Sequence, residues 1–237
     1  MKKFLFGFLF GIIGCLIFIS VSGSSLFGFV GEPFIEKILE PSVSPLPTAT
    51  PTSTPLDIVE KIVRDSSLSS VAIQTFQGNT LKKYGSGIIL SSDGLIVTTY
   101  ELSQGQTIQV LFEDKIFKAS VIKKDLARNI ALIKIEGSNL TVSGLDTAST
   151  YESGREYILT GKMVNLSKII TFSQKAIINY VQDKTILMDT NKNDMLNGAK
   201  TINYSGQMVG MIYTKAGKTF LISAQIISEF YSGSIAE

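Results

Sequence analysis

The sequence contains no histidine, and its single cysteine, Cys15, lies inside an N-terminal apolar run. Histidine is the side chain that most often transfers protons near neutral pH, so every mechanism that needs an imidazole base is excluded. One thiol can form neither a disulfide within the chain nor a cysteine-based zinc site. We therefore expect no zinc and no other cofactor. A calcium or magnesium site built from carboxylates alone stays open, although no spaced Asp/Asn/Gly loop indicates one.

An excess of charge of either sign is also lacking, because 22 Lys and Arg residues balance 20 Asp and Glu residues and leave a net charge of +2. The sequence has no basic run of the kind that neutralises nucleic-acid phosphates, and it has no acidic tail. Nucleic acid is therefore not an expected partner. The length of 237 residues fits one domain of moderate size with appendages.

The longest hydrophobic run is at the N-terminus. Lys2 and Lys3 precede apolar residues over 4–21, and small or apolar residues continue to Val30. About 20 apolar residues form a helix that crosses the hydrocarbon core of a bilayer, and positive charges at its start favour a cytoplasmic N-terminus. We expect residues 1–30 to be the cytoplasmic tip and transmembrane signal anchor of a single-pass protein. The rest of the chain would then lie in the periplasm or outside the cell.

Two other interpretations of this segment stay open. A cleaved signal peptide would end at a small-residue site, which Ser22-Gly23-Ser24 could provide. A lipoprotein would use Cys15 in a loose lipobox, although apolar residues continue past that cysteine.

All six prolines lie between Pro33 and Pro55. A short amphipathic stretch is followed there by a segment of Pro, Thr and Ser residues that cannot bury a core. Pro-rich chains extend by about 3.1 Å per residue, which makes this segment a semi-rigid spacer of roughly 45 Å. Residues 31–56 are thus predicted to be a juxtamembrane segment and linker, and the outer domain is predicted to span residues 57–237.

Short β-branched runs separated by turn signals make up most of the outer domain. A first set of expected strands covers 70–76, 81–90, 95–99, 107–112, 115–124 and 130–135. A second set covers 156–161, 168–181, 185–190, 199–204, 207–213 and 218–223. Helical spacing predicts short helices at 56–67 and 224–230. Six strands in about 70 residues suit a small closed barrel, so we expect an all-β domain with two barrels and terminal helices.

Three segments carry more specific patterns: GSGIILSSDGLIVT (85–98), NIALIKI (129–135) and NYSGQMVGM (203–211). The first resembles the strand–turn–strand of HtrA-type (DegP/DegS-like) trypsin-fold serine proteases, which there leads into Asn-Asn-His. The second resembles the Asp-Ile-Ala-Leu-Leu-Lys-Ile of that family, and the third resembles the stretch after its Gly-Asn-Ser-Gly-Gly-Pro. The resemblance covers roughly residues 57–230. It implies a trypsin-like double six-stranded β-barrel, and we expect no PDZ domain of the kind that often follows in this family.

The resemblance also identifies where a catalytic triad would lie. The histidine position falls on Glu101, the aspartate position on Asn129 and the serine position on Asn197. The glycine that helps to form the oxyanion hole is replaced by Met195. An amide is not a nucleophile at neutral pH, a neutral Asn cannot stabilise an imidazolium, and Glu101 has no nucleophile to activate. The resemblance therefore implies a catalytically degenerate member of the family.

From these features we expect a membrane-anchored extracytoplasmic pseudoprotease that binds a peptide or protein between its barrels and scaffolds the cell envelope. The alternative is a divergent serine-type endopeptidase with a relocated or residual active site, for which Lys200 and Ser205 are the candidate Ser–Lys dyad. We expect both to face solvent beside a turn, which argues against the dyad. A purely structural head that binds nothing is a third interpretation. Relatives of this type often form trimers, so a homo-oligomer stays open.

Overall fold

The computed structural model describes residues 55–166, 168–191 and 194–233. The predicted anchor (1–30) and nearly all of the predicted linker (31–56) lie outside the described residues. The last two linker positions, Pro55 and Leu56, begin the first helix. Within the described ranges, no helix is long and apolar enough to cross a membrane.

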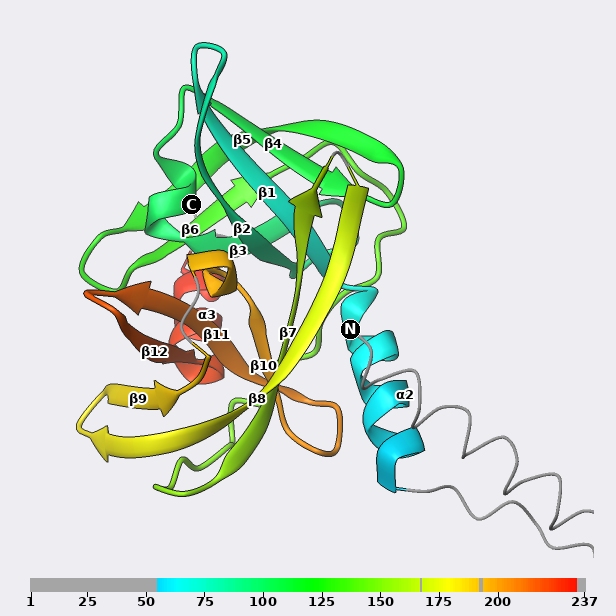
Figure 1. Ribbon diagram of the computed structural model, residues 1–237. Coiled ribbons are helices and arrows are strands. Elements are labelled where there is room, and N and C mark those ends of the chain that lie inside the picture. The colour runs from blue at the N-terminus through cyan, green and yellow to red at the C-terminus, as the bar shows by residue number, and fades with distance from the viewer. Residues whose placement is uncertain (1–54, 167, 192–193, 234–237) are drawn as a thin grey trace, which may run out of the picture. The chain divides into compact units, whose positions relative to one another are not determined.

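The first barrel is closed by antiparallel strands in the order β1-β2-β3-β6-β5-β4 (Figure 1). The strands are β1 (Ser70–Gln77), β2 (Thr80–Ile89), β3 (Leu95–Thr99), β4 (Thr107–Phe112), β5 (Lys115–Asp125) and β6 (Ile130–Lys134). Alternate side chains point inward, and fully buried aliphatic residues such as Ile73, Ile96 and Ile133 fill the interior. One turn of 3-10 helix, η1 (Tyr100–Ser103), follows β3.

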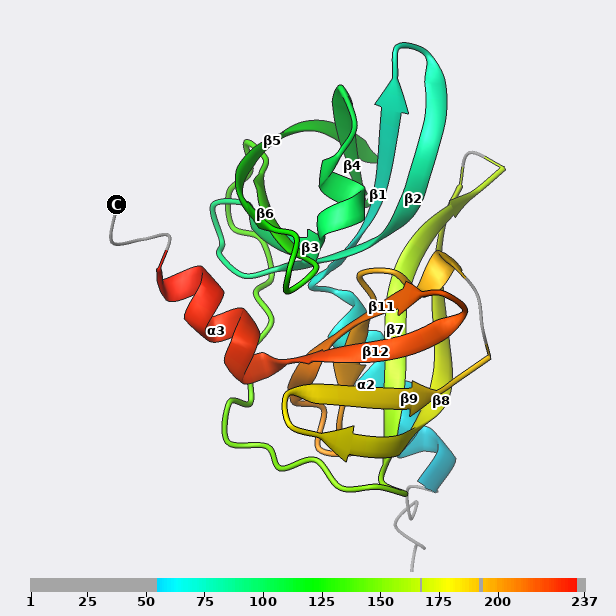
Figure 2. The same cartoon turned by 90° about the vertical axis from the view of Figure 1, so that its left-hand side faces the viewer.

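The second barrel is closed in the order β10-β11-β12-β9-β8-β7 (Figures 1 and 2). Its elements are β7 (Glu156–Asn165), β8 (Lys168–Gln182), β9 (Thr185–Asp189), η2 (Asp194–Leu196), β10 (Lys200–Ile202), β11 (Met208–Lys215) and β12 (Lys218–Ser223). The predicted double six-stranded, trypsin-like barrel is thereby confirmed. Strand β7 extends beyond its predicted end at residue 161, because residues 162–165 also pair with β8, down to Asn165↔Lys168.

Two short helices flank the barrels, as predicted. Helix α2 (Pro55–Ser67) packs on β7 and places Val59, Ile62 and Val63 against the apolar cluster shared by the two barrels. Helix α3 (Ala224–Ser232) packs on β11 and β12 (Figure 2). Its N-terminus is capped by Ser223, whose hydroxyl oxygen accepts a hydrogen bond from the Ile226 N–H.

The barrels are joined by backbone as well as by apolar side chains. The Ser86 N–H of β2 donates to the Asn197 carbonyl of the second barrel at 2.8 Å. The Ser86 hydroxyl donates to the Lys162 carbonyl of β7 at 2.8 Å and accepts from the Lys162 N–H at 3.1 Å. Gly198 lies so close to β2 that a Cβ built on it would overlap the Ser86 carbonyl, and its φ of +80° is left-handed. Both features require glycine at this position.

Lys200 ties helix α2 to the second barrel. Its ammonium donates to the Ser66 carbonyl at 2.7 Å and to the Ser69 hydroxyl at 2.6 Å. The side chain is only 2% exposed, so the expectation that Lys200 faces solvent is wrong. Position 200 begins β10, which pairs with β7 and β11 on both sides and lies under α2. Burial, and to a smaller extent the nearby Lys162 charge, lower the pKa of Lys200 to about 7.

We predict that Gly198→Ala lowers the free energy of unfolding by about 2–5 kcal/mol. Left-handed backbone costs a non-glycine residue about 1–2 kcal/mol, and the overlap with the Ser86 carbonyl adds overpacking of about 1–3 kcal/mol. Urea denaturation of the outer domain measures the loss. Gly217→Ala is the matched control, because Gly217 has φ +69° but nothing within 4 Å of a built Cβ. Equal losses in the two variants would contradict the close approach of the barrels.

The burial of Lys200 predicts that stability depends on pH at the alkaline side of neutrality. The pKa of Lys200 is 10.5 in a solvated chain and about 7 in the fold, so the unfolded chain binds more protons between these values. The free energy of unfolding should therefore rise as the pH rises from about 7 to about 10.5, by an amount on the order of a few kcal/mol. Lys200→Met should remove this rise. Denaturation midpoints of both proteins across that range test the expectation, and parallel pH profiles would contradict it.

Candidate functional site

The three predicted triad positions meet where the two barrels face each other. Glu101 lies in η1, at the end of β3, and Asn197 lies in the turn between η2 and β10. Asn129 lies in the turn just before β6 and has left-handed backbone with φ 52°, which Asn tolerates better than most residues. The Asn129 carbonyl accepts a hydrogen bond from the Tyr100 N–H at 3.2 Å, directly beside Glu101. The fold thus brings the three segments together as the resemblance implies.

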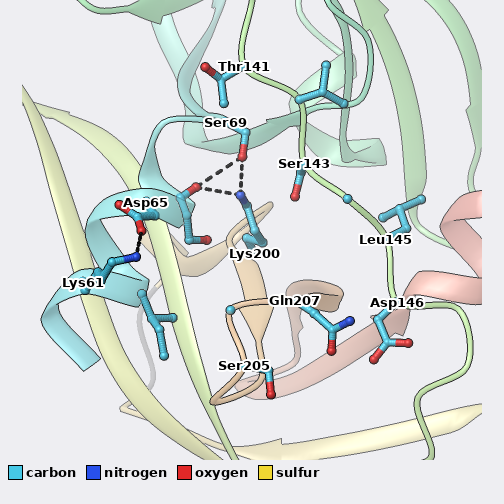
Figure 3. A pocket seen from close by; sticks show the side chains of 15 residues that line it. Lys61, Asp65, Ser69, Thr141, Ser143, Leu145, Asp146, Lys200, Ser205 and Gln207 are labelled. Atoms are coloured by element: carbon cyan, nitrogen blue, oxygen red, sulfur yellow. Dashed lines mark hydrogen bonds and ion pairs between the residues drawn. The ribbon is translucent and has the colours of Figure 1, made fainter. Parts of the chain in front are cut away.

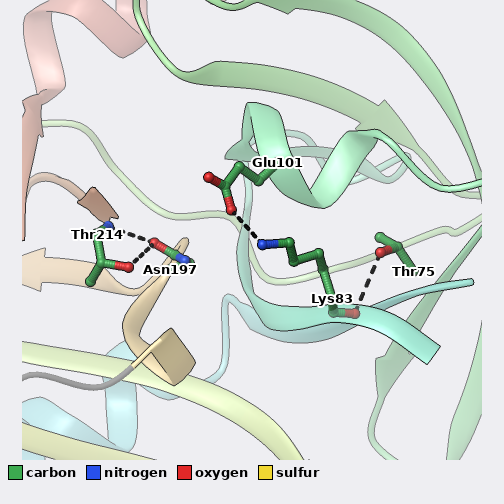
Figure 4. A network of polar contacts seen from close by, with 5 residues as sticks. All are labelled: Thr75, Lys83, Glu101, Asn197 and Thr214. Carbon is green, nitrogen blue, oxygen red and sulfur yellow. Dashed lines mark hydrogen bonds and ion pairs between the residues drawn. The ribbon is translucent and has the colours of Figure 1, made fainter. Parts of the chain in front are cut away.

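The side chains at these positions do not form a relay. In the described part of the chain, no hydrogen bond links the side chains of Glu101, Asn129 and Asn197 to one another. Glu101 instead pairs with Lys83 of β2, with a carboxylate oxygen 3.2 Å from Nζ (Figure 4). Both partners are partly exposed, with side-chain exposures of 57% for Lys83 and 43% for Glu101, so the pair contributes at most about 1 kcal/mol to stability.

Asn197 is held by Thr214 of β11. Its Oδ1 accepts a hydrogen bond from the Thr214 N–H at 2.6 Å and another from the Thr214 hydroxyl at 3.1 Å (Figure 4). A backbone N–H can only donate, so these bonds assign Oδ1 to the Thr214 side and direct the amide Nδ2 away from it. The amide oxygen at the predicted serine position therefore serves as an acceptor within the fold.

The turn that carries Asn197 is closed by the backbone. The Gly198 N–H donates to the Ile212 carbonyl at 2.9 Å, and the Ala199 N–H donates to the Leu196 carbonyl at 2.9 Å. Met195, at the position of the oxyanion-hole glycine, lies half-buried in η2. These backbone hydrogen bonds fix the conformation of the turn and thereby the position of Asn197.

A groove of about 360 Å³ remains between the barrels at this place. It is lined from the first barrel by Lys82, Lys83, Tyr84, Glu101 and Leu102, and from the second barrel by Asn197, Thr214, Lys215 and Ala216. The sequence indicated Glu101 and Asn197, but it carried no signal for Lys83 or Thr214. Their contacts join residues 18 and 17 positions apart and exist only after the barrels close.

A second cavity, of about 440 Å³, lies beside helix α2 and contains the buried Lys200 (Figure 3). The Ser69 hydroxyl and Lys200 Nζ lie 2.6 Å apart on its wall, and Ser66 also lines it. Ser205, the predicted partner of Lys200, is exposed and has no hydrogen bond to Lys200 in the described structure. The structure thus pairs Lys200 with Ser69 and not with Ser205. Ser69 is 131 positions away from Lys200, and no local pattern connects them.

No group of three or more His, Cys, Asp or Glu residues gathers closely enough to hold a metal ion in the ranges that the structure describes. The groove is lined by three lysines and one carboxylate, together with the Asn197 amide and the Thr214 hydroxyl. The cavity is lined by two lysines and two aspartates, together with hydroxyl groups.

Known proteins with similar sequences are serine proteases of one kind, although no protein-family model matches the chain. The chain is 30% identical to the serine endoprotease DegS of Haemophilus influenzae over 166 residues, covering 66% of this chain and 49% of that protein. It is 28% identical to the serine protease HTR4 of Rattus norvegicus over 199 residues, covering 73% of this chain and 40% of that protein. The chain thus spans less than half the length of these relatives.

A solved structure supports the same fold. The crystal structure of the serine endoprotease from Yersinia pestis matches with a TM-score of 0.66 and 22% identity, covering 79% of this chain and 68% of that chain. Because the match covers 79% of this chain, it includes residues of both barrels. The sequence relatives support an HtrA/DegP-like serine protease family for this chain, and the solved structure supports its trypsin-like fold.

Proposed function

We propose that the protein is a membrane-anchored, extracytoplasmic pseudoprotease whose inter-barrel groove binds an extended peptide or protein segment. One observation carries the proposal: a groove lies between the barrels, whereas the residues at the predicted positions of the catalytic base and the nucleophile are bonded to other residues of the fold. Glu101 pairs with Lys83, and Asn197 accepts two hydrogen bonds from Thr214. A protein of this kind would scaffold other proteins of the cell envelope.

The chemistry of the substituted positions supports a role without proteolysis. Loss of the nucleophile or of the base alone lowers turnover about a millionfold in well-studied triads. Binding and oxyanion donors retain about a thousandfold over the reaction in water at best. Asn197 cannot attack a carbonyl at neutral pH, and Asn129 carries no charge to orient a base. Binding by addition of a strand to the groove needs none of these groups.

The proposed location follows from the N-terminal apolar segment and from the relatives. A helix over residues 4–21 with lysines before it is suited to cross a membrane with the outer domain outside the cytoplasm. A relative from Pseudomonas fluorescens, 30% identical over 145 residues, is described as a probable periplasmic serine endoprotease, DegP-like. A location of the outer domain in the periplasm or at the cell exterior is consistent with this relative.

A second candidate function is favoured by the pair in the cavity beside α2. Neutral Lys200 could accept the Ser69 proton over the same 2.6 Å that now joins them, which is the geometry of a Ser–Lys nucleophile. Burial lowers the pKa of Lys200 to about 7, so the neutral amine is populated near neutral pH. Against this candidate, Ser69 is only 3% exposed and Lys200 also caps the end of helix α2, which is a structural role.

We predict that a fluorophosphonate probe leaves the purified outer domain unlabelled and that the domain does not cleave unfolded casein. The groove holds no serine among its described lining residues, and Asn197 does not react with the probe. Labelling is read by intact-mass spectrometry and then mapped by peptide digestion.

Labelling at Ser69 that disappears in both Ser69→Ala and Lys200→Met would establish the second candidate and refute the first. Cleavage of casein that is lost in Asn197→Ala would show a residual site in the groove and would also refute the first. A probe-reactive serine protease run in parallel verifies the reagent.

We predict that the full chain sediments with membranes and resists extraction at alkaline pH, whereas a chain that begins at residue 57 stays in the supernatant. The reason is the apolar run over 4–21, which is long enough to span the hydrocarbon core. Fractionation with immunodetection of the outer domain tests this. Release of the intact full chain by alkaline carbonate would contradict the anchor.

A further inference from the structure

The groove that carries the proposed function is positively charged. Three lysines line it, Lys82, Lys83 and Lys215, against one carboxylate, Glu101. Lys83 is neutralised by Glu101 at 3.2 Å. In the described structure, Lys82 and Lys215 have no carboxylate within ion-pair distance, and both are exposed. Two uncompensated ammonium groups, one from each barrel, therefore flank the groove.

The position of Lys82 depends on an irregularity of β2. The register passes from Thr75↔Lys83 to Phe76↔Leu81, so Lys82 is the extra residue of a β-bulge. In a regular strand, successive side chains point to opposite faces, whereas here the consecutive residues 82, 83 and 84 all line the groove. A bulge redirects side chains in this way and often lies next to a binding site.

A lysine at position 215 is unfavourable for the stability of the β11–β12 hairpin. Lys215 lies directly opposite Lys218 in the β11–β12 hairpin. Like charges directly opposite each other destabilise an antiparallel pair. Lys215 thus adds to the groove lining a second positive charge without an ion-pair partner among the residues that the structure describes.

Asn197 adds a directional donor between these charges. Because Thr214 occupies Oδ1, the Nδ2 group of Asn197 points away from Thr214, and Nδ2 has no hydrogen-bond partner among the described residues (Figure 4). An amide N–H₂ in this place can donate to a carbonyl oxygen of an extended chain.

We infer that the groove selects an acidic peptide segment in extended conformation. Its carboxylates would pair with Lys82 and Lys215, and one of its backbone carbonyls would accept a hydrogen bond from the Asn197 amide. This inference rests on the proposed function, since it names the class of ligand that the same groove takes. Electrostatic pairing of this kind contributes mainly selectivity and a faster association rate, and it weakens as salt shortens the Debye length.

The test uses two fluorescein-labelled ten-residue peptides, one with four Glu residues and one with four Gln residues at the same positions. Fluorescence anisotropy with the full chain in detergent measures the affinity of each. We expect the Glu peptide to bind about tenfold more tightly than the Gln peptide at 0.1 M salt. The difference should largely disappear at 1 M salt, where the Debye length falls from about 10 Å to about 3 Å.

Charge reversal locates the effect. Lys82→Glu/Lys215→Glu should remove the preference for the Glu peptide, whereas the control Lys118→Glu/Lys184→Glu should keep it. Both double variants change two lysines and take the net charge from +2 to −2 (two changes of −2 each), so bulk charge is matched. Asn197→Asp keeps the acceptor for Thr214 but loses the donor, and it should weaken both peptides, with unchanged urea denaturation as the check on folding.

The outcomes separate the two levels of the argument. Equal binding of the Glu and Gln peptides overturns the acidic preference and leaves the peptide-binding function standing. Loss of the preference in the Lys118/Lys184 control assigns it to bulk charge and overturns the placement in the groove. Binding of neither peptide overturns both the preference and the proposed function for ligands of this length.

Discussion

The rest of this structure depends on one close approach of backbone to backbone, where β2 of the first barrel crosses the 197–198 turn of the second. Gly85 and Gly198 allow the contact because they have no Cβ. A Cβ on Gly85 would overlap the Asn197 carbonyl, and a Cβ on Gly198 would overlap the Ser86 carbonyl. Ser86 then bonds the Asn197 carbonyl through its N–H and the backbone of Lys162 through its hydroxyl. These directional bonds set the orientation of the barrels, which apolar packing alone would leave less defined. The groove is a consequence of that orientation.

Because the backbone defines the groove, the groove does not need the catalytic side chains of the family. Glu101 and Asn197 occupy positions whose surroundings are polar, and each has a protein partner, Lys83 and Thr214 respectively. A buried or half-buried polar group without a partner costs about 1–3 kcal/mol. The pairing of Glu101 with Lys83 and of Asn197 with Thr214 avoids this cost at both positions.

Lys200 illustrates the same rule at higher cost. An ammonium on a side chain that is only 2% exposed loses most of its hydration, which explains why its pKa falls to about 7. It is tolerated because the Ser66 carbonyl, at the C-terminal end of helix α2, and the Ser69 hydroxyl replace part of the lost water. The link also places α2, the element that follows the predicted linker, against the second barrel. The fold thus uses a buried polar contact to orient the segment that leads toward the proposed anchor.

By itself the sequence determined the strands of both barrels, the two short helices and the places of Glu101, Asn129 and Asn197, because these depend on side-chain periodicity, turn residues and spacing along the chain. The tertiary structure alone decided that Lys200 is buried against Ser69, that Lys83 pairs with Glu101 and that Thr214 holds Asn197. Each of these contacts joins residues that are distant in sequence, and closure of the barrels brings them together. The tertiary structure also decided the bulge at Lys82, which lines the groove. The register of β2 is set by its pairing with β1 and not by the composition of β2 itself.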